Sequence, residues 1–432
     1  MPKPFSKLAE SIGRAPQWVT VVFAAFVTFS VYTCMYGYRK AFTAAGFEDQ
    51  SLWGVDYKIW LVTAQVIGYM FSKFYGIKFI AGHISSNRAS IILKLIFSAW
   101  MALLGFALIP SPFNILFLFL NGFPLGMIWG LVFSYVEGRR ATELMGAVLA
   151  SSFIFASGLA KSTGTWLMTN LHVTERWMPF TAGAIYFVPL LIFTTLLQSI
   201  PEPTEKDKES RCIRVSMNTA QRKEVIRRFF PGLFLLIISY ILLTILRDFR
   251  DNFANEILKE LGLGGDATVF TKTETPVAII VLVLISSLML VKNNFKAFYL
   301  NHLIILAGWL IAAGATLLFM YTIISPFAWF TAVGTGLYLS YIPINCLYFD
   351  RMIASFKLTA NVGFIMYIAD SFGYLGSVLV LFIKQFSGLH LSWTKFFTLA
   401  ILSSTAVSIV CLLGTLFFYQ KKYKAFIKNS PL

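Results

Sequence analysis

The chain has 432 residues, of which 57% are hydrophobic and only 13% are charged, and its mean hydropathy is +0.71. Soluble domains carry roughly 45–50% apolar and about 25% charged residues, so this composition excludes a soluble protein and indicates a lipid-facing surface. The formal net charge of +16 would also fit a nucleic-acid-binding protein, a question that the positions of the charges decide below.

Apolar runs of roughly 20 residues, the length that crosses a bilayer core of about 30 Å, recur along the chain. The first run is too long for the core of a signal peptide and lacks a small-residue cleavage site, so we interpret it as a permanent span. We predict twelve spans, near 18–40, 57–80, 90–109, 113–135, 143–169, 178–199, 230–252, 270–291, 299–320, 325–348, 357–384 and 394–419.

One segment rich in charge and proline, 200–229, divides these spans into two groups of six. The predicted domains are an N-terminal six-helix bundle at 1–199, a cytoplasmic linker loop at 200–229 and a C-terminal six-helix bundle at 230–432. The predicted fold class is therefore an all-α polytopic membrane protein with two pseudo-symmetric six-helix bundles.

Basic residues concentrate in alternate loops of this arrangement. One side holds Arg139, Arg140, Lys292, Lys296, Arg351, Lys357, Lys421, Lys422, Lys424 and Lys428, together with Lys206, Lys208, Arg211, Arg214, Arg222, Lys223, Arg227 and Arg228 of the linker. The opposite loops hold Glu48, Asp49, Asp56, Glu256, Glu260 and Asp266. This asymmetry follows the positive-inside rule, so we expect cytoplasmic termini and no nucleic-acid partner. The short loops and the absence of an organelle signal favour a bacterial inner membrane.

The four cysteines are scattered, and none has a partner at metal-ligand spacing. We therefore expect neither a disulfide framework nor a zinc site, and no metal or cofactor. The cysteines are Cys34, Cys212, Cys346 and Cys411.

Span 113–135 carries three glycines on one helical face, which allows a neighbouring helix to approach closely: Gly122, Gly126 and Gly130. Packing alone accounts for them. Pro124 and Pro343 are expected to bend their spans, because proline removes a helical hydrogen bond and clashes with the preceding turn.

A local repeat connects the two halves. Two trios at spacing i, i+4, i+7, each on one helix face, lie 208 residues apart: Tyr32, Tyr36 and Arg39, then Tyr240, Thr244 and Arg247. Two halves of equal helix number with such a match suggest a parallel repeat about an axis along the membrane normal, as in major facilitator transporters.

Ionisable side chains inside a membrane span cost about 2.5–3.5 kcal/mol unless they face water or a partner, so they are the first candidates for function. Arg39 lies late in its span and either reaches the membrane interface or faces the axis between the halves, where Arg247 occupies the matching place. A guanidinium offers a planar fork of donors to phosphate or carboxylate oxygens. An empty pair would repel, so we predict that Arg39 and Arg247 clamp a small anion.

Two lysines extend this candidate site. Lys73 shares a helix face with Gln65 and Tyr69 and either faces a cavity or reaches the cytoplasmic surface. Lys161 is deep in its span and either contacts substrate or forms a structural ion pair, for which Asp370 is the candidate partner. Tyrosine hydroxyls could also donate to a substrate, although most membrane tyrosines pack or lie at the interface; the candidates are Tyr32, Tyr36, Tyr69 and Tyr240.

Three carboxylates are candidates for proton coupling or for ion pairs: Asp370, Asp248 and Glu274. Glu274 precedes Pro276 near the outer end of its span, where a solvated position at the mouth is the alternative. Arg250 and Asp251 are expected to cap the outer end of span 230–252.

Four short segments resemble the organophosphate:phosphate antiporter branch of the major facilitator superfamily, which includes the glycerol-3-phosphate and hexose-phosphate transporters. They lie at Tyr38–Phe42, Gly68–Phe74, Tyr240–Arg247 and Phe372–Gly376. The resemblance implies phosphate-binding roles for Arg39 and Arg247 and a cavity role for Lys73. Phe155 stands where that branch is expected to have a cavity histidine, and the loop 82–88 lacks the superfamily's acidic residue, so the chain resembles a divergent member.

We therefore expect a secondary active transporter that moves a small anionic solute, an organophosphate or related organic anion, by alternating access. Both anion exchange, with inorganic phosphate as counter-substrate, and proton coupling stay open. A membrane-embedded anion sensor of the same fold is the alternative. An enzyme is not expected, because the sequence has no acidic metal cluster, nucleophile elbow or histidine pair at catalytic spacing. The expected oligomeric state is a monomer in the lipid bilayer.

Overall fold

A computed structural model gives the fold. It describes residues 6–48, 50–82, 88–137, 139, 141–203, 207, 219–288, 290–358, 363–386 and 391–429. Among the charges used for the topology prediction, some lie outside these described residues: Asp49, Arg140, Lys206, Lys208, Arg211 and Arg214. The side chain of Arg222 also lies outside them.

The N-terminal part of the chain is helical apart from a short hairpin. Its elements are α1 (Ser6–Arg14), α2 (Gln17–Lys40), η1 (Ala41–Ala44), β1 (Ser51–Leu52), β2 (Val55–Asp56), α3 (Tyr57–Gly82), α4 (Arg88–Leu108), α5 (Ile115–Leu125), α6 (Ile128–Phe133), α7 (Thr142–Asn170) and α8 (Met178–Leu197). The hairpin strands are antiparallel and pair Ser51 with Asp56. Its turn requires positive φ at Trp53 and at Gly54, where glycine adopts it without strain.

The C-terminal part contains longer helices. Its elements are α10 (Thr219–Asn252), α11 (Ala254–Glu260), α12 (Val269–Leu288), α13 (Asn294–Met320), α14 (Pro326–Pro343), η2 (Ile344–Tyr348), α15 (Phe349–Ser355), α16 (Gly363–Phe386) and α17 (Trp393–Asn429). The predicted effect of the two prolines coincides with changes in helix type. Pro124 lies just before the break between α5 and α6, and α14 ends at Pro343, where the π-helix η2 begins.

Among the described residues, ten helices are long and apolar enough to cross a membrane. They coincide with ten of the predicted spans. The other two predicted spans, 57–80 and 357–384, are occupied by α3 and α16. The prediction of an all-α polytopic membrane protein is confirmed.

By internal contacts the chain divides into two compact units. Unit 1 contains Met1–Arg211, Asp251–Ile279 and Leu381–Leu389, and unit 2 contains Cys212–Arg250, Ile280–Val380 and His390–Leu432. The end of α10 and all of α11 thus pack with the N-terminal helices, whereas the body of α10 packs with the C-terminal ones.

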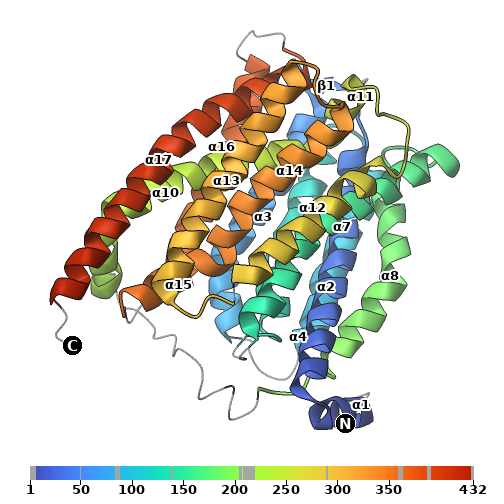
Figure 1. Cartoon of the computed structure of the whole chain (residues 1–432). Helices are drawn as coiled ribbons and strands as arrows, with labels where there is room; N and C mark the ends of the chain where they lie inside the picture. The colour runs from blue at the N-terminus through green and yellow to red at the C-terminus, as the bar shows by residue number, and fades with distance from the viewer. Residues whose placement is uncertain are drawn as a thin grey trace. The chain divides into compact units, whose positions relative to one another are not determined.

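The core of unit 1 is built around α2. This helix packs against α7 and α8, as Figure 1 shows, and α3 packs against α5. The side chains of Val31 and Met35 on α2, Ile96 on α4 and Leu149 on α7 are all buried in one hydrophobic cluster. Burying such apolar side chains fixes which face of α2 turns inward.

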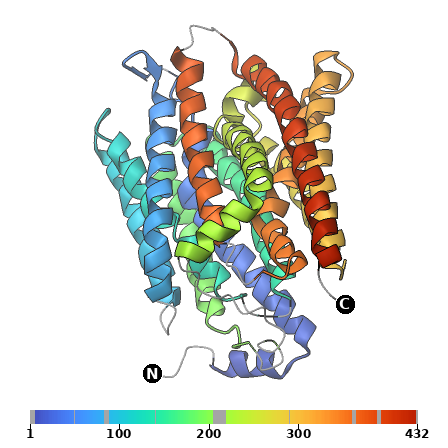
Figure 2. The same cartoon turned by 90° about the vertical axis from the view of Figure 1, so that its left-hand side faces the viewer.

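The core of unit 2 is built around α13, which packs against α14 and α17. Figure 2 shows α17 running alongside α13. The helices α13 and α14 meet at two glycines. A Cβ on Gly336 would lie 2.8 Å from the backbone nitrogen of Ala312, and Cβ atoms on Gly308 and Gly336 would each collide with the other's carbonyl oxygen. Glycine is therefore required for this close approach.

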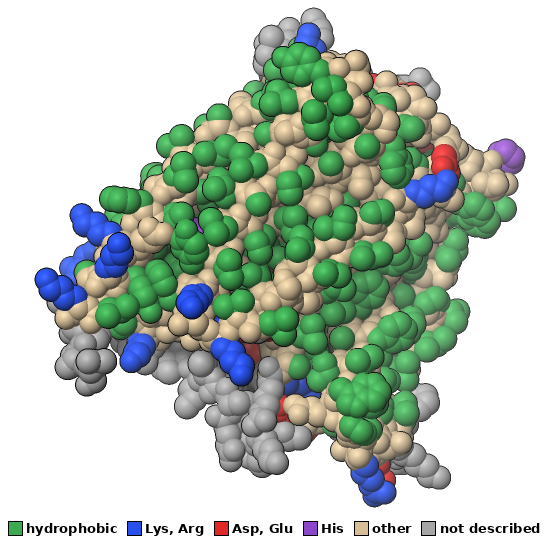
Figure 3. All heavy atoms as spheres, viewed as in Figure 1, with side chains coloured by type: hydrophobic (Ala, Val, Ile, Leu, Met, Phe, Trp, Pro, Cys, Tyr) green, Lys and Arg blue, Asp and Glu red, His purple; other side chains and the backbone are tan. Residues whose placement is uncertain are grey.

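Exposed apolar side chains form the surface that faces lipid. They include Val22 and Phe26 on α2, and Leu303 and Leu310 on α13. Over α13 and α14, the face drawn in Figure 3 is largely hydrophobic. Contiguous exposed apolar surface of this extent is unusual for a soluble monomer and is the normal condition inside a bilayer.

Gly122 of α5 and Gly126, the residue that follows this helix, pack closely as the sequence predicted. A Cβ on Gly122 would collide with the carbonyl oxygen of Gln65 on α3, and one on Gly126 would lie 2.7 Å from the Ser72 side chain. We expect Gly122→Ala to destabilise the protein by about 1–3 kcal/mol, because backbone atoms must move apart. Gly314→Ala on α13 is the matched control, since no atom lies within 4 Å of its added Cβ. Thermal unfolding in detergent measures both, and equal melting temperatures would contradict the packing role.

Candidate functional site

Arg39 lies in the last turn of α2 and is buried within unit 1, with 9% of its surface exposed. Its guanidinium carbon lies 3.9 Å from the ring centroid of Tyr69 on α3 and 5.6 Å from that of Tyr36. Both distances are within the range of cation–π attraction. Arg39 is thus held against tyrosine faces, and its burial does not fit the alternative of a solvated position at the membrane interface.

Two amides hold the end of α2 in place. The side chain of Gln65 on α3 donates to the carbonyl oxygen of Arg39 at 3.0 Å and to the side-chain oxygen of Asn121 on α5 at 2.8 Å. Asn121 in turn donates to the carbonyl oxygens of Tyr38 and Ala99. Because these amides are buried, the hydrogen bonds fix the backbone that carries Arg39.

Tyr32 and Tyr36 belong to an aromatic cluster in unit 1. Their ring centroids lie 5.5 Å apart, and the ring of Tyr32 also lies 5.4 Å from Trp129 and 5.2 Å from Phe153. Both tyrosines are buried. They line the same face of α2 as Arg39, as the spacing predicted.

Lys161 is paired with Asp251. Its ammonium lies 2.5 Å from Oδ1 of Asp251, and Lys40 lies 2.5 Å from Oδ2 of the same carboxylate. Ser157, one turn before Lys161 on α7, donates to Asp251 as well. The exposed fractions are 1% for the Lys161 side chain, 5% for Lys40 and 12% for Asp251. Two buried lysines therefore share one largely buried carboxylate.

This pairing corrects two expectations. Asp370 was the candidate partner if Lys161 formed an ion pair, and we expected Asp251 to cap its helix at the membrane surface. Asp251 is instead the acidic centre of the lysine cluster, because the last turn of α10 packs in unit 1. Arg250, the other expected cap, is 2% exposed in unit 2 and donates to the carbonyl oxygen of Phe330.

The segment after Asp251 is also held by charge. Lys40 donates to the side chain of Asn252 at 2.7 Å. Lys58 on α3 lies 2.6 Å from Glu256 on α11 and donates to the carbonyl oxygen of Thr43. Lys58 and Glu256 are both largely buried, so within unit 1 α11 is joined to α3 by a desolvated ion pair.

An exposed ion pair adds to this contact. Lys259 on α11 lies 2.7 Å from Glu48, and its hydrogen bond and charge lower the pKa of the Glu48 carboxyl. A carboxyl whose pKa is lowered on folding stabilises the fold at pH values above 4.5, its ordinary pKa. This stabilisation is lost as the pH falls through the lowered pKa. The pair is exposed, so its contribution is less than about 1 kcal/mol.

We expect hydrogen-exchange protection of α11 to fall slightly between pH 7 and pH 3, after correction for intrinsic exchange. The Glu48→Gln variant should have the lower protection at pH 7, and its difference from the wild type should shrink at pH 3. A variant that keeps the wild-type pH dependence would assign the effect to another group.

In unit 2, Arg247 lies in α10 beside its own counter-ion. Its guanidinium lies 2.5 Å from Asp248, and its central carbon lies 4.1 Å from the ring centroid of Tyr341 on α14. Ser377 on α16 donates to the other oxygen of Asp248 at 3.0 Å. The two arginines at repeat positions thus share one arrangement, a guanidinium over a tyrosine ring, although the residue after each differs: Lys40 in one and Asp248 in the other.

Tyr240 and Asp370 form a second polar cluster of unit 2. The hydroxyl of Tyr240 donates to Asp370 at 2.5 Å and lies 3.2 Å from the hydroxyl of Tyr341 and 3.3 Å from the side-chain oxygen of Asn345. The rings of Tyr240 and Tyr341 are stacked, with centroids 5.4 Å apart. Asn345 lies in η2, and π-helical turns often occur at functional sites.

Glu274 is buried, with 3% of its surface exposed, so the expectation of a solvated mouth residue is wrong. It lies on α12, which packs closely on α7 in unit 1: a Cβ on Gly158 would lie 2.9 Å from the Glu274 side chain. Thr271, one turn earlier, donates to the hydroxyl of Ser162. This contact with α7 removes Glu274 from solvent.

Two further sequence predictions concern Lys73 and Phe155. Lys73 lies in α3, but its side chain is outside the described residues.

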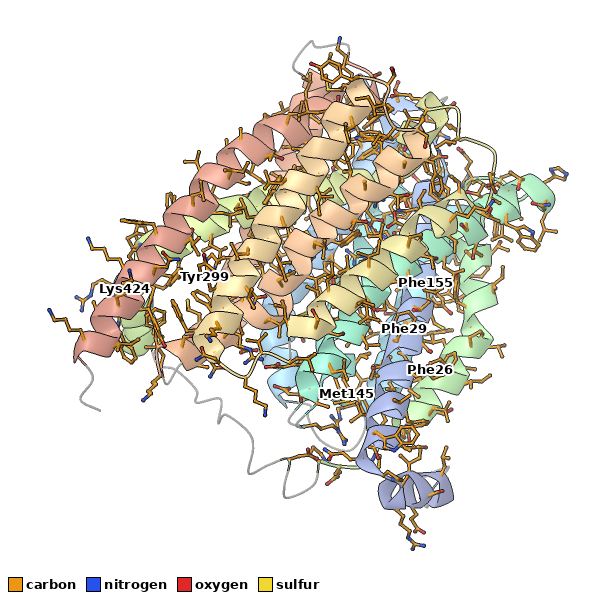
Figure 4. The ribbon with its side chains drawn as sticks, viewed as in Figure 1. Phe26, Phe29, Met145, Phe155, Tyr299 and Lys424 are labelled. Atoms are coloured by element: carbon orange, nitrogen blue, oxygen red, sulfur yellow. The ribbon has the colours of Figure 1, made fainter. Side chains whose placement is uncertain are left out.

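Phe155, at the place of the expected histidine, has its ring centroid 5.8 Å from that of Phe29. Figure 4 shows Phe29 on α2 and Phe155 on α7. Aromatic packing between these helices thus occupies that position.

The sequence analysis missed four polar residues of these clusters: Asp251, Lys58, Tyr341 and Asn345. A signal existed for Asp251, which lies one helical turn after Arg247. Tyr341 and Asn345 lie one turn apart on either side of Pro343, where a bend in the span was predicted. Lys58 stands at the beginning of its span, where a lysine ordinarily lies in the interface.

Solved structures give the fold. A bacterial homologue of the human lysosomal transporter Spinster, inward-facing and unoccupied, has 12% identity and a TM-score of 0.61, covering 96% of this chain and 99% of that chain. A D-xylose–proton symporter has 13% identity and a TM-score of 0.60, with 91% and 97% covered. The human organic anion transporter MFSD10 has 10% identity and a TM-score of 0.56, with 93% and 100% covered. The chain therefore has the major facilitator fold of multi-pass membrane proteins.

Sequence comparison gives the family. No curated protein matches the sequence. A family model described as a family of unknown function, DUF5690, matches residues 41–422, which is most of the chain. The protein belongs to the DUF5690 family.

Proposed function

We propose that this protein is a secondary active transporter of a small anionic solute, an organophosphate or a related organic anion. The fold supports transport, since the similar solved structures carry the names of transporters for a sugar, nucleosides and organic anions. The observation that carries the anion specificity is the matched placement of Arg39 and Arg247. Arg39 is buried in unit 1, the side chain of Arg247 in unit 2 is 12% exposed, and each guanidinium lies over a tyrosine ring.

Arginine suits this role for three reasons. Its guanidinium stays charged at every physiological pH, offers two parallel donors to a phosphate or carboxylate, and is more weakly hydrated than an ammonium. The tyrosine faces of Tyr69 and Tyr341 hold the planar group in a fixed orientation. A pre-oriented guanidinium loses less entropy when the anion binds.

The lysine cluster of unit 1 also favours a negatively charged solute. Lys40, Lys161 and Asp251 together carry a formal charge of +1, and Arg39 directly precedes Lys40 in α2. We propose that Lys161 tunes the site through Asp251. Tyr32, Tyr36, Tyr69, Tyr240 and, by resemblance, Lys73 are the further candidates for contact with the solute.

The role of Asp248 distinguishes two possible mechanisms, anion exchange and proton symport. The carboxylate of Asp248 competes with an incoming anion for Arg247, because the two side chains are already paired at 2.5 Å. Anion exchange follows if the solute simply displaces Asp248. Proton symport follows if Asp248, Asp370 or Glu274 takes up a proton when the anion binds. Both routes use alternating access of the major facilitator type.

Counterflow in proteoliposomes tests this function. Vesicles are loaded with inorganic phosphate, and uptake of radiolabelled phosphate is measured with a panel of phosphate esters, carboxylates, neutral sugars and nucleosides as competitors. We expect saturable uptake that anions inhibit and neutral solutes do not. Uptake inhibited only by neutral sugars or nucleosides would overturn the anion proposal. Saturable anion binding without any counterflow would indicate the sensor instead.

We also propose a bacterial inner membrane with both termini in the cytoplasm. The distribution of charge in the loops supports this orientation. A reporter active only in the cytoplasm, fused after Leu432, is expected to be active. Activity of a periplasmic reporter at the same position would reverse the orientation. The proposed functional unit is a monomer.

A further inference from the structure

We infer that His302 is a positioning residue for the polar cluster of Tyr240 and Asp370 in unit 2. Through a hydrogen bond to Tyr348, it holds the π-helical turn η2 in the register that keeps Asn345 beside Tyr240. The inference rests on the proposed function, because Tyr240 is one of the candidates for contact with the solute.

The π-helical turn η2 begins where Pro343 interrupts the hydrogen bonding of α14. Proline has no backbone N–H, so the carbonyl oxygen of Leu339, four residues earlier, receives no helical hydrogen bond from this position. The five residues Ile344–Tyr348 are π-helical, and the α-helix resumes at Phe349. Such single turns are rare, and an α-helix is the commoner continuation. Side-chain contacts that stabilise η2 are therefore of interest.

The last residue of η2, Tyr348, is bound to His302 of α13. The Tyr348 hydroxyl lies 2.7 Å from Nε2 of His302, and Nδ1 of the same ring lies 3.0 Å from the carbonyl oxygen of Phe298. A carbonyl oxygen only accepts, so in the neutral ring Nδ1 carries the proton and Nε2 accepts from Tyr348. His302 is 2% exposed and Tyr348 is 0% exposed. This hydrogen bond is costly to break, because a buried group that loses its partner gains no water in exchange.

Aromatic rings fix the orientation of the His302 side chain. The ring centroid of Phe298 lies 4.7 Å from that of His302 and 4.8 Å from that of Tyr348. Tyr419 of α17 packs on the same group, with its ring centroid 5.1 Å from that of Phe298. Close packing on several sides restricts the rotamers of a side chain. The imidazole is thus held with Nε2 directed at Tyr348.

Asn345 holds η2 from a different side. Its amide nitrogen donates to the carbonyl oxygen of Tyr341 at 3.1 Å, and its side-chain oxygen lies 3.3 Å from the hydroxyl of Tyr240 on α10. Tyr240 donates to Asp370 of α16. Asn345 therefore turns toward α10, whereas Tyr348, three residues later, turns toward α13. A rotation of η2 would break both contacts together.

The helix α13 is a fixed support for η2. It packs along α14, as Figure 1 shows. Ser340, in the last turn of α14, donates to the carbonyl oxygen of Ile305 on α13 at 2.8 Å. His302 lies three residues before Ile305, so the contact with Tyr348 continues this line of contacts from α14 into η2. Loss of that contact leaves η2 free to rotate and removes Asn345 from Tyr240.

Two substitutions separate the hydrogen bonds of His302. The amide of glutamine reaches the position of Nε2 and accepts from Tyr348, whereas the shorter asparagine reaches only the position of Nδ1 and keeps the bond to Phe298. We therefore expect His302→Gln to keep η2 in place, and His302→Asn and Tyr348→Phe to release it. The matched control is Tyr423→Phe, which removes another tyrosine hydroxyl of unit 2 and keeps the ring that stacks on Phe295.

Cys346 lies within η2 and is partly exposed, so its reactivity reports on this turn without any transport assay. The purified full-length protein is treated with N-ethylmaleimide, and mass spectrometry follows the peptide that contains Cys346. We expect modification about fivefold faster in His302→Asn and in Tyr348→Phe, the factor that corresponds to one net hydrogen bond. His302→Gln and Tyr423→Phe should change the rate less than about twofold.

Counterflow in proteoliposomes tests the link to the solute. The two variants that release η2 should raise the KM of the transported anion about fivefold at an unchanged maximal rate per reconstituted protein, since binding is weakened and the rest of the cycle is not. A general loss of folded protein would instead lower the maximal rate. His302→Gln should retain the wild-type KM.

Three results would overturn the inference: one modification rate for all variants, equal effects of glutamine and asparagine at position 302, or faster modification with an unchanged KM. Absence of counterflow in the wild-type protein would be a failure of the proposed function. The modification rates would still decide whether His302 holds η2, so the two failures are distinguishable.

Discussion

Alanine at Arg39 or at Arg247 is expected to reduce the specific uptake of the transported anion at least a hundredfold. A charge-assisted hydrogen bond contributes about 1.5–3 kcal/mol, and a guanidinium makes two of them to a phosphate or carboxylate, so about 3 kcal/mol or more is lost. That corresponds to a factor of about 100 or more in binding. The measurement is counterflow in proteoliposomes, normalised to the amount of reconstituted protein.

Lysine at the same positions separates charge from geometry. Arg39→Lys and Arg247→Lys keep the positive charge but lose the planar fork, so we expect intermediate uptake with a raised KM. Arg14→Ala is the control, because the Arg14 side chain is 85% exposed and should not affect uptake. Full uptake by the Arg39→Ala protein would remove Arg39 from the site, whether or not Arg247 stays in it.

A second large effect is expected from Asp251→Asn. The substitution keeps the size of the side chain but removes the carboxylate with which the buried ammonium groups of Lys40 and Lys161 pair. Removing one partner of a buried ion pair typically costs about 3–5 kcal/mol, because charge is left in a medium of low polarity. We expect a large fall in the melting temperature of the purified protein in detergent.

The control for this prediction is Asp266→Asn. Asp266 lies in the exposed loop before α12, pairs with Lys272 of that helix and accepts hydrogen bonds from Thr268. These partners lower the pKa of the Asp266 carboxyl to about 2. Its loss should cost less than about 1 kcal/mol. Adding Lys161→Met to Asp251→Asn should restore part of the stability, since one of the two ammonium groups is then removed. Equal melting temperatures for Asp251→Asn and the wild type would show that the cluster does not stabilise the fold.

The partners of the buried charged side chains could not be predicted from the sequence. The sequence indicated that Lys161 needed a partner, and the structure supplies Asp251, 90 residues later in the chain. Lys58 pairs with Glu256 across 198 residues. Hydropathy and helical periodicity report on neighbours within a few turns, so neither pairing was predictable from the sequence.

Glu274 is a second residue whose environment the sequence did not predict. Its place near a span end suggested solvent, yet the close approach of α12 to Gly158 of α7 buries it. By contrast, the close packing predicted from Gly122 and Gly126 was correct, because small residues at helical spacing directly permit a short interhelical distance.

The sequence by itself determined the class of protein, the positions of the spans and the two arginines at repeat positions, since the thickness of a bilayer and the cost of a buried charge act on single residues and short windows. Only the tertiary structure decided which residues surround those charges: tyrosine faces for Arg39 and Arg247, Asp248 for Arg247, and Asp251 for two lysines. Electrostatic pairing depends on distance in space, and that distance is fixed when the helices pack.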